Sequence, residues 1–130
     1  MDQAREWQSE IVRKLKDANI VILNPRRENW DSSWKQELSD RNFVGQVEWE
    51  LDAIEMADLV AVHFEPDTKS PITMLEIGLF AKSDPKKLII HCPEGFWRKG
   101  NIDIVCRRYG IKQVETLDEL AGEIRGRSRD

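Results

Sequence analysis

The fold is decided by residues 59–81, whose sequence is LVAVHFEPDTKSPITMLEIGLFA. The first six residues form an apolar run of the kind expected for a parallel strand that is covered on both faces. Ser70 and Pro71 then suit the N-cap and the first position of a helix that extends to Ala81. A strand followed by a helix is the repeating unit of a parallel α/β sheet.

Glu76 lies in the middle of this otherwise apolar helix, with Ile72 one turn before it and Phe80 one turn after it. A helix that is apolar all round is expected to be buried. A carboxylate there is costly unless it is paired or faces a polar cleft, and such residues are common in active sites. The alternative is a core glutamate that is satisfied by a nearby arginine or backbone group.

Strands and helices alternate on both sides of this stretch. The pattern predicts strands at residues 20–23, 59–64, 88–91 and 111–114. Amphipathic helices are predicted before Asn19, over residues 44–57, before a stop at Gly110, and after a capping box at residues 116–119. We therefore expect one domain over residues 1–130, with a doubly wound, flavodoxin- or Rossmann-like parallel sheet and helices on both faces. In such folds the ligand binds beyond the carboxyl ends of the strands, here in the loops at residues 24–42, 65–70 and 92–101.

The composition is that of an ordinary soluble domain, with 40% hydrophobic and 34% charged residues. A net charge of -4 argues against a nucleic-acid polymer as the main partner. No signal peptide or membrane span is expected. Cys92 and Cys106 have no metal-ligand spacing, which favours reduced thiols in a cytoplasmic protein, and the two histidines suggest no metal site.

A second carboxylate is expected to point inward from the helix at residues 44–57. Of its four acidic residues, Glu50 lies closest to the apolar stripe, at about 50–60° from its centre. Glu48, Asp52 and Glu55 are expected to form a solvated face. Two inward carboxylates, one of them with a shifted pKa, can split a glycosidic bond, although this signal is weak when taken alone.

Trp30 and Trp34, on the loop at residues 24–42, could stack on a flat ligand, or they could cover a sheet edge or a subunit contact. The chain has no GxGxxG and no P-loop motif, so neither a dinucleotide site nor a P-loop nucleotide site is indicated. It also lacks a nucleophile elbow.

Several short motifs together resemble the nucleoside 2-deoxyribosyltransferase-like family. They are Asn24-Pro25-Arg26-Arg27, Trp30-Asp31-Ser32-Ser33-Trp34, Gln46-Val47-Glu48-Trp49-Glu50, Ala57-Asp58, Ser70-Pro71-Ile72, Leu75-Glu76-Ile77-Gly78 and Gly95-Phe96-Trp97-Arg98-Lys99-Gly100-Asn101. The similarity extends from about Trp7 to the last helix. Each motif is short, but the combination is specific.

The resemblance implies a homo-oligomeric enzyme, without a cofactor, that cleaves the N-glycosidic bond of a 2'-deoxynucleoside or its 5'-monophosphate and passes the sugar to another base. It makes Glu76 the nucleophile and Glu50 the acid that assists the leaving base. Ser70 matches a position near the 5' end of the sugar, and Asn101 a residue that completes the site, in some relatives that of a neighbouring subunit. The positions implied to bind substrate are Asn24, Arg27, Trp30, Asp31, Ser70 and Asn101.

One departure concerns the start of the chain. Relatives begin with an apolar strand and a Gly-Ser turn that grips the sugar, whereas this sequence opens on a helix, so we expect the first strand of the family to be absent. Two alternatives to the transferase stay open. One is a hydrolase that passes the sugar to water, and the other is a module that binds a nucleotide-like ligand without turnover.

Overall fold

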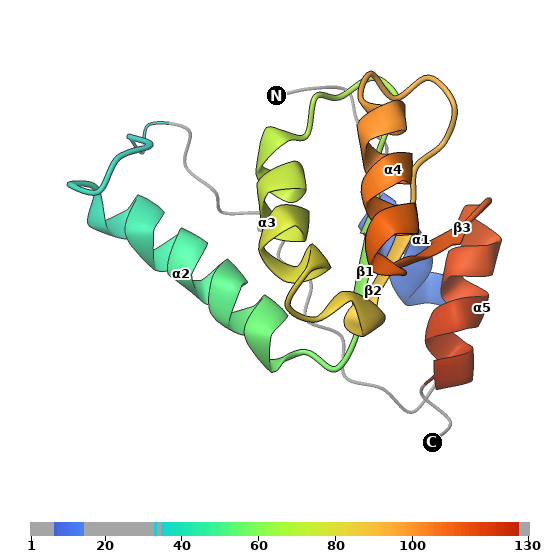
Figure 1. The fold of residues 1–130 in the computed structure, drawn as a ribbon. Helices are drawn as coiled ribbons and strands as arrows, with labels where there is room; N and C mark the ends of the chain where they lie inside the picture. The colour runs from blue at the N-terminus through green and yellow to red at the C-terminus, as the bar shows by residue number, and fades with distance from the viewer. Residues whose placement is uncertain (1–6, 15–32, 34, 128–130) are drawn as a thin grey trace. The chain divides into compact units, whose positions relative to one another are not determined.

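The computed structural model describes residues 7–14, 33 and 35–127. Its elements in chain order are α1 (Trp7–Lys14), α2 (Arg41–Met56), β1 (Val60–His63), α3 (Pro71–Ala81), the 3-10 turn η1 (Pro85–Lys87), β2 (Leu88–His91), α4 (Lys99–Tyr109), β3 (Lys112–Val114) and α5 (Leu117–Arg127) (Figure 1). Contacts divide the chain into two compact units, residues 22–58 and the remainder, and each is described by itself.

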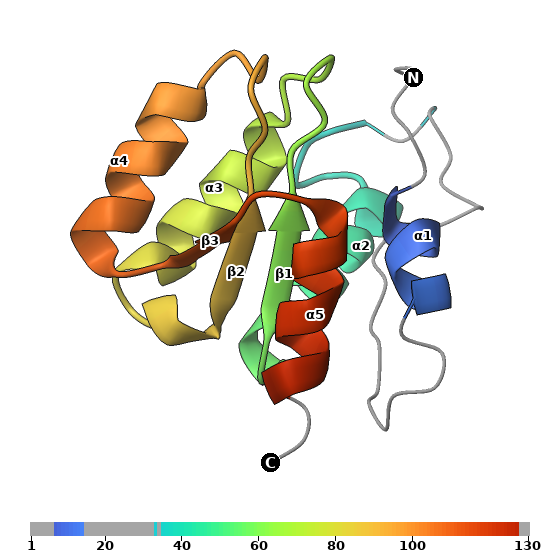
Figure 2. The ribbon, with the colours of Figure 1, turned by 90° about the vertical axis from the view of Figure 1, so that its right-hand side faces the viewer.

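The larger unit contains a parallel sheet with strand order β1-β2-β3. His63 of β1 lies opposite His91 of β2, and His91 in turn lies opposite Val114 of β3. Helices α3 and α4 cover one face of the sheet, and α1 and α5 cover the other (Figure 2). The doubly wound parallel arrangement expected from the sequence is therefore confirmed. The strand predicted at residues 20–23 lies outside the described residues.

Each face of the sheet has its own hydrophobic core, which explains why the central strands show no alternation of polar and apolar residues. Ile90 joins the cluster that contains Ile77 of α3 and Cys106 of α4. Ile89 joins the cluster that contains Leu120 of α5. Neighbouring residues of a strand point to opposite faces, and both isoleucines are completely buried. Hence β2 is the central strand among those that the structure describes.

The ends of the helices have identifiable causes. Helix α4 ends at Gly110, which adopts the left-handed conformation as predicted. It begins at Lys99, so the expectation that Asn101 lies in a loop is wrong. In the smaller unit α2 begins after Asp40, whose carboxylate accepts hydrogen bonds from the backbone N–H groups of Asn42 and Phe43.

Helix α5 begins with the predicted capping box. The hydroxyl of Thr116 accepts a hydrogen bond from the N–H of Glu119 at 3.0 Å. The carboxylate of Glu119 accepts one from the N–H of Glu115 at 3.0 Å. Among the helices in the described part of the chain, none has the length and the apolar character that crossing a membrane requires.

Candidate active site

Two loops meet beyond the carboxyl ends of β1 and β2, where a parallel sheet places its ligand. One connects β1 to α3 and the other connects β2 to α4 (Figure 2). The indole N–H of Trp97 donates a hydrogen bond to the carbonyl of Lys69 at 3.0 Å. A second contact joins the same two segments, where the ring centroids of Phe64 and Phe96 are 4.5 Å apart. The fold therefore fixes the Ser70 segment beside the Trp97 segment, as the loop positions in the sequence predict.

Ser70 occupies the N-cap position of α3 but does not cap the helix with its side chain, so that expectation is wrong. Its backbone is left-handed, with φ 48° and ψ 48°. Its hydroxyl instead forms a hydrogen bond of 2.7 Å with the hydroxyl of Thr68. Of the non-glycine residues that are described, Ser70 alone has a positive φ. Such strain persists where the surroundings enforce it and is frequent at functional sites.

Helix α3 is apolar all round, but it is not buried all round. Ile77 and Ala81 pack into the core with 4% and 3% exposure. Exposed side chains form a stripe on another side of the helix, which we call the α3 stripe: Ile72 (61%), Leu75 (62%) and Leu79 (52%). The expected burial is wrong because the sheet can cover only one side of the helix in the larger unit.

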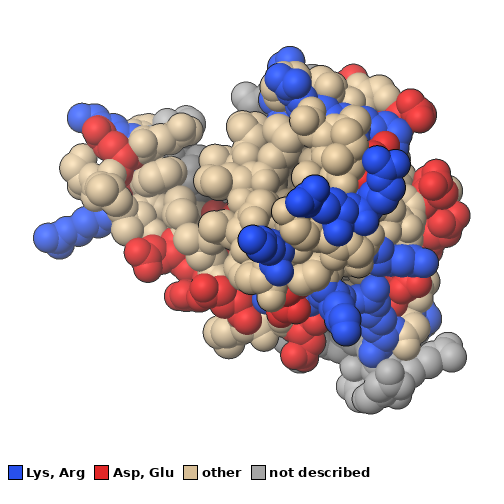
Figure 3. Space-filling view, in the orientation of Figure 1, with Lys and Arg blue, Asp and Glu red and all other residues tan. Residues whose placement is uncertain are grey.

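Glu76 lies beside the α3 stripe, one turn after Ile72, and is half-buried. The residue also has an interaction partner. The residue is therefore neither a fully enclosed core glutamate nor a freely solvated one. Figure 3 shows a largely uncharged surface over α3, and the exposed residues of the α3 stripe are apolar.

Glu50 of α2 is also half-buried, while Glu48, Asp52 and Glu55 are exposed, as the helical spacing predicts. Burial raises the pKa of the Glu50 carboxyl above its ordinary value, and a hydrogen bond from the side chain of Gln46 partly offsets this rise. Gln46 itself is only 3% exposed. A carboxyl group that keeps its proton is suited to act as a general acid.

The remaining expected site residues divide into three groups. Asn101 is exposed on the first turn of α4. Glu50 belongs to the smaller unit, so it is not placed relative to Glu76. The other predicted substrate-binding positions lie outside the described residues: Asn24, Arg27, Trp30 and Asp31. Within the described part, no group of three His, Cys, Asp or Glu side chains could hold a metal ion.

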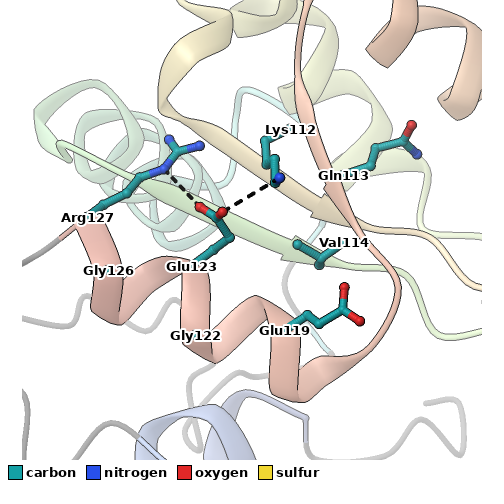
Figure 4. A pocket seen from close by; sticks show the side chains of 8 residues that line it. All are labelled: Lys112, Gln113, Val114, Glu119, Gly122, Glu123, Gly126 and Arg127. Carbon is teal, nitrogen blue, oxygen red and sulfur yellow. Dashed lines mark ion pairs between the residues drawn. The ribbon is translucent and has the colours of Figure 1, made fainter.

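Two hollows in the described surface lie away from Glu76 and Ser70. One, of about 580 Å³, is lined by residues that include His91, Lys99 and Glu115. The other, of about 450 Å³, lies between β3 and α5 (Figure 4). There an oxygen of Glu123 lies 3.7 Å from Nζ of Lys112 and the other lies 3.4 Å from Nε of Arg127, so this carboxylate forms ion pairs with both cations that line the hollow.

Sequence reasoning placed both histidines on strands but missed that they form a pair. Nδ1 of His63 lies 2.8 Å from Nδ1 of His91, and both side chains are buried. Nε2 of His63 also lies 2.8 Å from a carboxylate oxygen of Glu65. The signal was present, because each histidine is near the carboxyl end of its predicted strand. Only the strand register brings them into contact.

The family comparison covers most of the chain. Residues 1–96 match the model of the family described as nucleoside 2-deoxyribosyltransferase like. The matched region includes Glu50, Ser70 and Glu76 but stops before Asn101. None of the curated proteins compared with the chain matches it. Because the match extends over well more than half of the sequence, the chain belongs to the nucleoside 2-deoxyribosyltransferase-like family.

Proposed function

We propose that this protein cleaves the N-glycosidic bond of a 2'-deoxynucleoside, or of its 5'-monophosphate, and transfers the deoxyribosyl group to another base. Family membership supports the reaction class. The observation that carries the proposal is the position of Glu76, a half-buried carboxylate beside an exposed apolar stripe on the helix that follows β1. A substrate that covers this stripe would remove water from the carboxylate.

The reaction is a double displacement. A carboxylate oxygen of Glu76 attacks the anomeric carbon of the sugar, and the carbon–nitrogen bond breaks with its electron pair moving to the base. Glu50 donates a proton to the departing base. The acceptor base then attacks the glycosyl ester, which frees the Glu76 carboxylate and returns a proton to Glu50.

The state of Glu50 supports its assignment as the acid. Its pKa is raised by burial, so a larger fraction of the group is protonated near neutral pH than for an ordinary glutamate. The other acidic residues of α2 that the sequence singles out are exposed. Glu50 is therefore the residue of that helix best suited to general acid catalysis.

The residues to which we assign substrate binding come from three separate stretches of the chain. We propose that Asn24, Arg27, Trp30 and Asp31 contact the nucleoside and that Ser70 contacts the 5' end of the sugar. Asn101, on a homo-oligomeric neighbour or on the same chain, completes the site. The strained turn of Ser70 supports a contact with ligand at this position.

A base-exchange assay tests the proposal. The protein is mixed with several deoxynucleosides and a different free base, and the products are separated by chromatography. We expect a new deoxynucleoside with the wild-type protein and a loss of exchange with Glu76→Gln. Intact-mass measurement after mixing with donor alone should show a deoxyribosyl adduct that Glu76→Gln does not form.

Each of the other possible outcomes would contradict part of this proposal. Base release with water as the only acceptor would make the protein a hydrolase. Binding of the nucleoside without any base release would make it a binding module. Exchange at the wild-type rate by Glu76→Gln would exclude Glu76 as the nucleophile.

A further inference from the structure

The exposed ring of Trp97 is in contact with two cations, one from each loop of the candidate site. Nζ of Lys69 lies 4.2 Å from the centroid of the ring, and Cζ of Arg98 lies 4.6 Å from it. Because both distances end at the same point, the two cationic groups are no farther apart than the sum of these distances. The fold therefore gathers two positive charges next to Ser70.

The backbones that carry these cations are packed against each other. Phe64 and Phe96, whose rings are in contact, are both buried beneath the two loops. Gly95 has a φ of 96°, and a Cβ there would lie 3.5 Å from Cβ of Pro66. Both loops extend beyond the same edge of the sheet (Figure 2). Groups whose backbones are fixed before a ligand arrives bind it at a lower entropic cost.

Neither cation is neutralised by a carboxylate. Asp67 and Glu94 are exposed on the same two loops, but among the residues that the structure describes no carboxylate forms an ion pair with Lys69 or Arg98. The two like charges repel each other, and the contact of a cation with an exposed aromatic ring is weak. An anion with several oxygens would replace these contacts by charge-assisted hydrogen bonds.

The hydroxyl groups beside the cations are already engaged. The hydroxyl of Thr68 donates to the carbonyl of Glu65 at 3.0 Å and lies 2.7 Å from the hydroxyl of Ser70. A hydroxyl has only one hydrogen to donate, so Ser70 is the donor in the second contact. A deprotonated phosphate group only accepts hydrogen bonds. Its recognition would therefore depend on Lys69 and Arg98.

The cations also lie at a suitable distance from the proposed nucleophile. Glu76 follows Ser70 by six residues, which is about 9 Å along the axis of α3. Side chains of a helix lean towards its N-terminus, and this shortens the distance to the carboxylate. The anomeric carbon and the 5'-phosphate of a nucleotide are separated by the sugar, a distance of the same order.

We propose that Lys69 and Arg98 bind the 5'-phosphate of the substrate, so that the protein selects 2'-deoxynucleoside 5'-monophosphates over nucleosides. In the free protein both cations rest on the ring of Trp97, and the phosphate draws them away from it. This inference rests on the proposed function, because it names the form of the substrate that the same site takes.

Calorimetry tests the preference without any need for activity. Glu76→Gln, which should bind without turnover, is titrated with each deoxynucleoside and with its 5'-monophosphate at one salt concentration. We expect the monophosphate to bind at least about tenfold more tightly, the effect of a hydrogen bond to a charged group. A nucleoside that binds equally well or more tightly would overturn the proposal.

Variants of the two cations locate the phosphate. Lys69→Met and Arg98→Met should each weaken binding of the monophosphate about tenfold and leave that of the nucleoside unchanged. Lys69→Arg keeps the charge and should keep the preference. Two controls remove an exposed cation elsewhere: Arg108→Met, whose guanidinium lies 5.8 Å from the ring centroid of Tyr109, and Lys82→Met at the end of α3. Equal losses in the controls would mean that general attraction, and not this pair, binds the phosphate.

NMR of the indole N–H groups tests the role of the ring. The signal of Trp97 is assigned by its loss in Trp97→Phe. It should shift when the monophosphate is added and shift much less with the nucleoside. Equal shifts with both ligands would place the phosphate away from Trp97 and overturn the proposal.

Two further probes identify the source of the phosphate. Inorganic phosphate should compete with the monophosphate only weakly and should not displace the nucleoside. Inorganic phosphate that binds as tightly as the monophosphate would make this a site for a free anion. A single-stranded oligodeoxynucleotide that binds more tightly than the monophosphate, and loses this affinity in Lys69→Met, would assign the cations to a polymer. Either result would overturn the proposal.

The base-exchange assay then separates this inference from the proposed function. If the monophosphate binds through Lys69 and Arg98 but no base is exchanged, the phosphate site stands and the proposed function fails. If exchange occurs equally well with nucleosides and monophosphates, the proposed function stands and the phosphate site fails. If both hold, Lys69→Met should lower kcat/KM about tenfold for the monophosphate donor and leave it unchanged for the nucleoside donor.

Discussion

At the residue scale, the acid role of Glu50 makes a prediction about pH. Its raised pKa means that the group keeps its proton to a higher pH than an ordinary glutamate does. Base exchange should therefore decline on the alkaline side only above the usual range of glutamate. Glu50→Gln should lower the exchange rate about 100-fold and abolish this decline. Glu48→Gln, an exposed neighbour on the same helix, is the control and should retain the wild-type pH profile. A profile unchanged by Glu50→Gln would remove Glu50 from the proton transfer.

The sequence predicts which residues are important more readily than it predicts their conformations and contacts. The inward position of Glu50 followed from helical spacing alone, because that helix has one apolar stripe. The sequence predicts Ser70 as an ordinary N-cap, but its backbone is left-handed, a conformation that no local sequence signal indicates for a serine. The contact between His63 and His91 depends on strand register, which a single sequence does not specify.

At the element scale, the two sides of α3 should respond differently to truncation. Ile77 packs into the core at 4% exposure, so Ile77→Ala should lower the free energy of unfolding by about 2–4 kcal/mol. Leu75 is 62% exposed, and Leu75→Ala should change it by less than about 0.5 kcal/mol. Urea unfolding of both variants measures the difference. Equal losses would mean that the α3 stripe is covered in solution.

The start of α5 offers a second test at this scale. Thr116→Ala removes the hydroxyl that accepts from the N–H of Glu119, and it should cost about 1 kcal/mol of unfolding free energy. Thr116→Ser keeps the acceptor and should stay close to the wild type in urea unfolding. This cap was predictable because its motif is local. The exposure of α3 was not, because its uniformly apolar composition does not reveal which side faces the sheet.

At the scale of the whole molecule, alternation of strands and helices was sufficient to predict a parallel sheet with two covered faces, since right-handed crossovers leave few alternatives. The division into two compact units was not predicted. It depends on which contacts form between segments that are distant in sequence, and hydrophobic periodicity carries no such information.

The two free thiols, Cys92 and Cys106, provide a test of the core that lies beneath α3 and α4, because both are buried in it. Burial raises the pKa of Cys92 to about 11 and that of Cys106 to about 12. The thiolate is the reactive form, so a thiol reagent at pH 8 should react slowly with the native protein. Both thiols should become reactive together when urea unfolds the domain. Rapid reaction of one thiol before unfolding would show that its part of the core opens separately.

The same shifts determine how stability depends on pH in the alkaline range. Above the ordinary thiol pKa of about 9, the unfolded chain loses protons that the folded chain retains. The free energy of unfolding should therefore fall as the pH rises from 9 towards 11, by at most about 1.4 kcal/mol per pH unit for each thiol. Lysine and tyrosine titrate in this range as well, so the measurement is the difference between the wild type and Cys106→Ala. Removing the thiol should make the decline less steep, and identical slopes would mean that Cys106 is as easily ionised in the folded protein as in the unfolded chain.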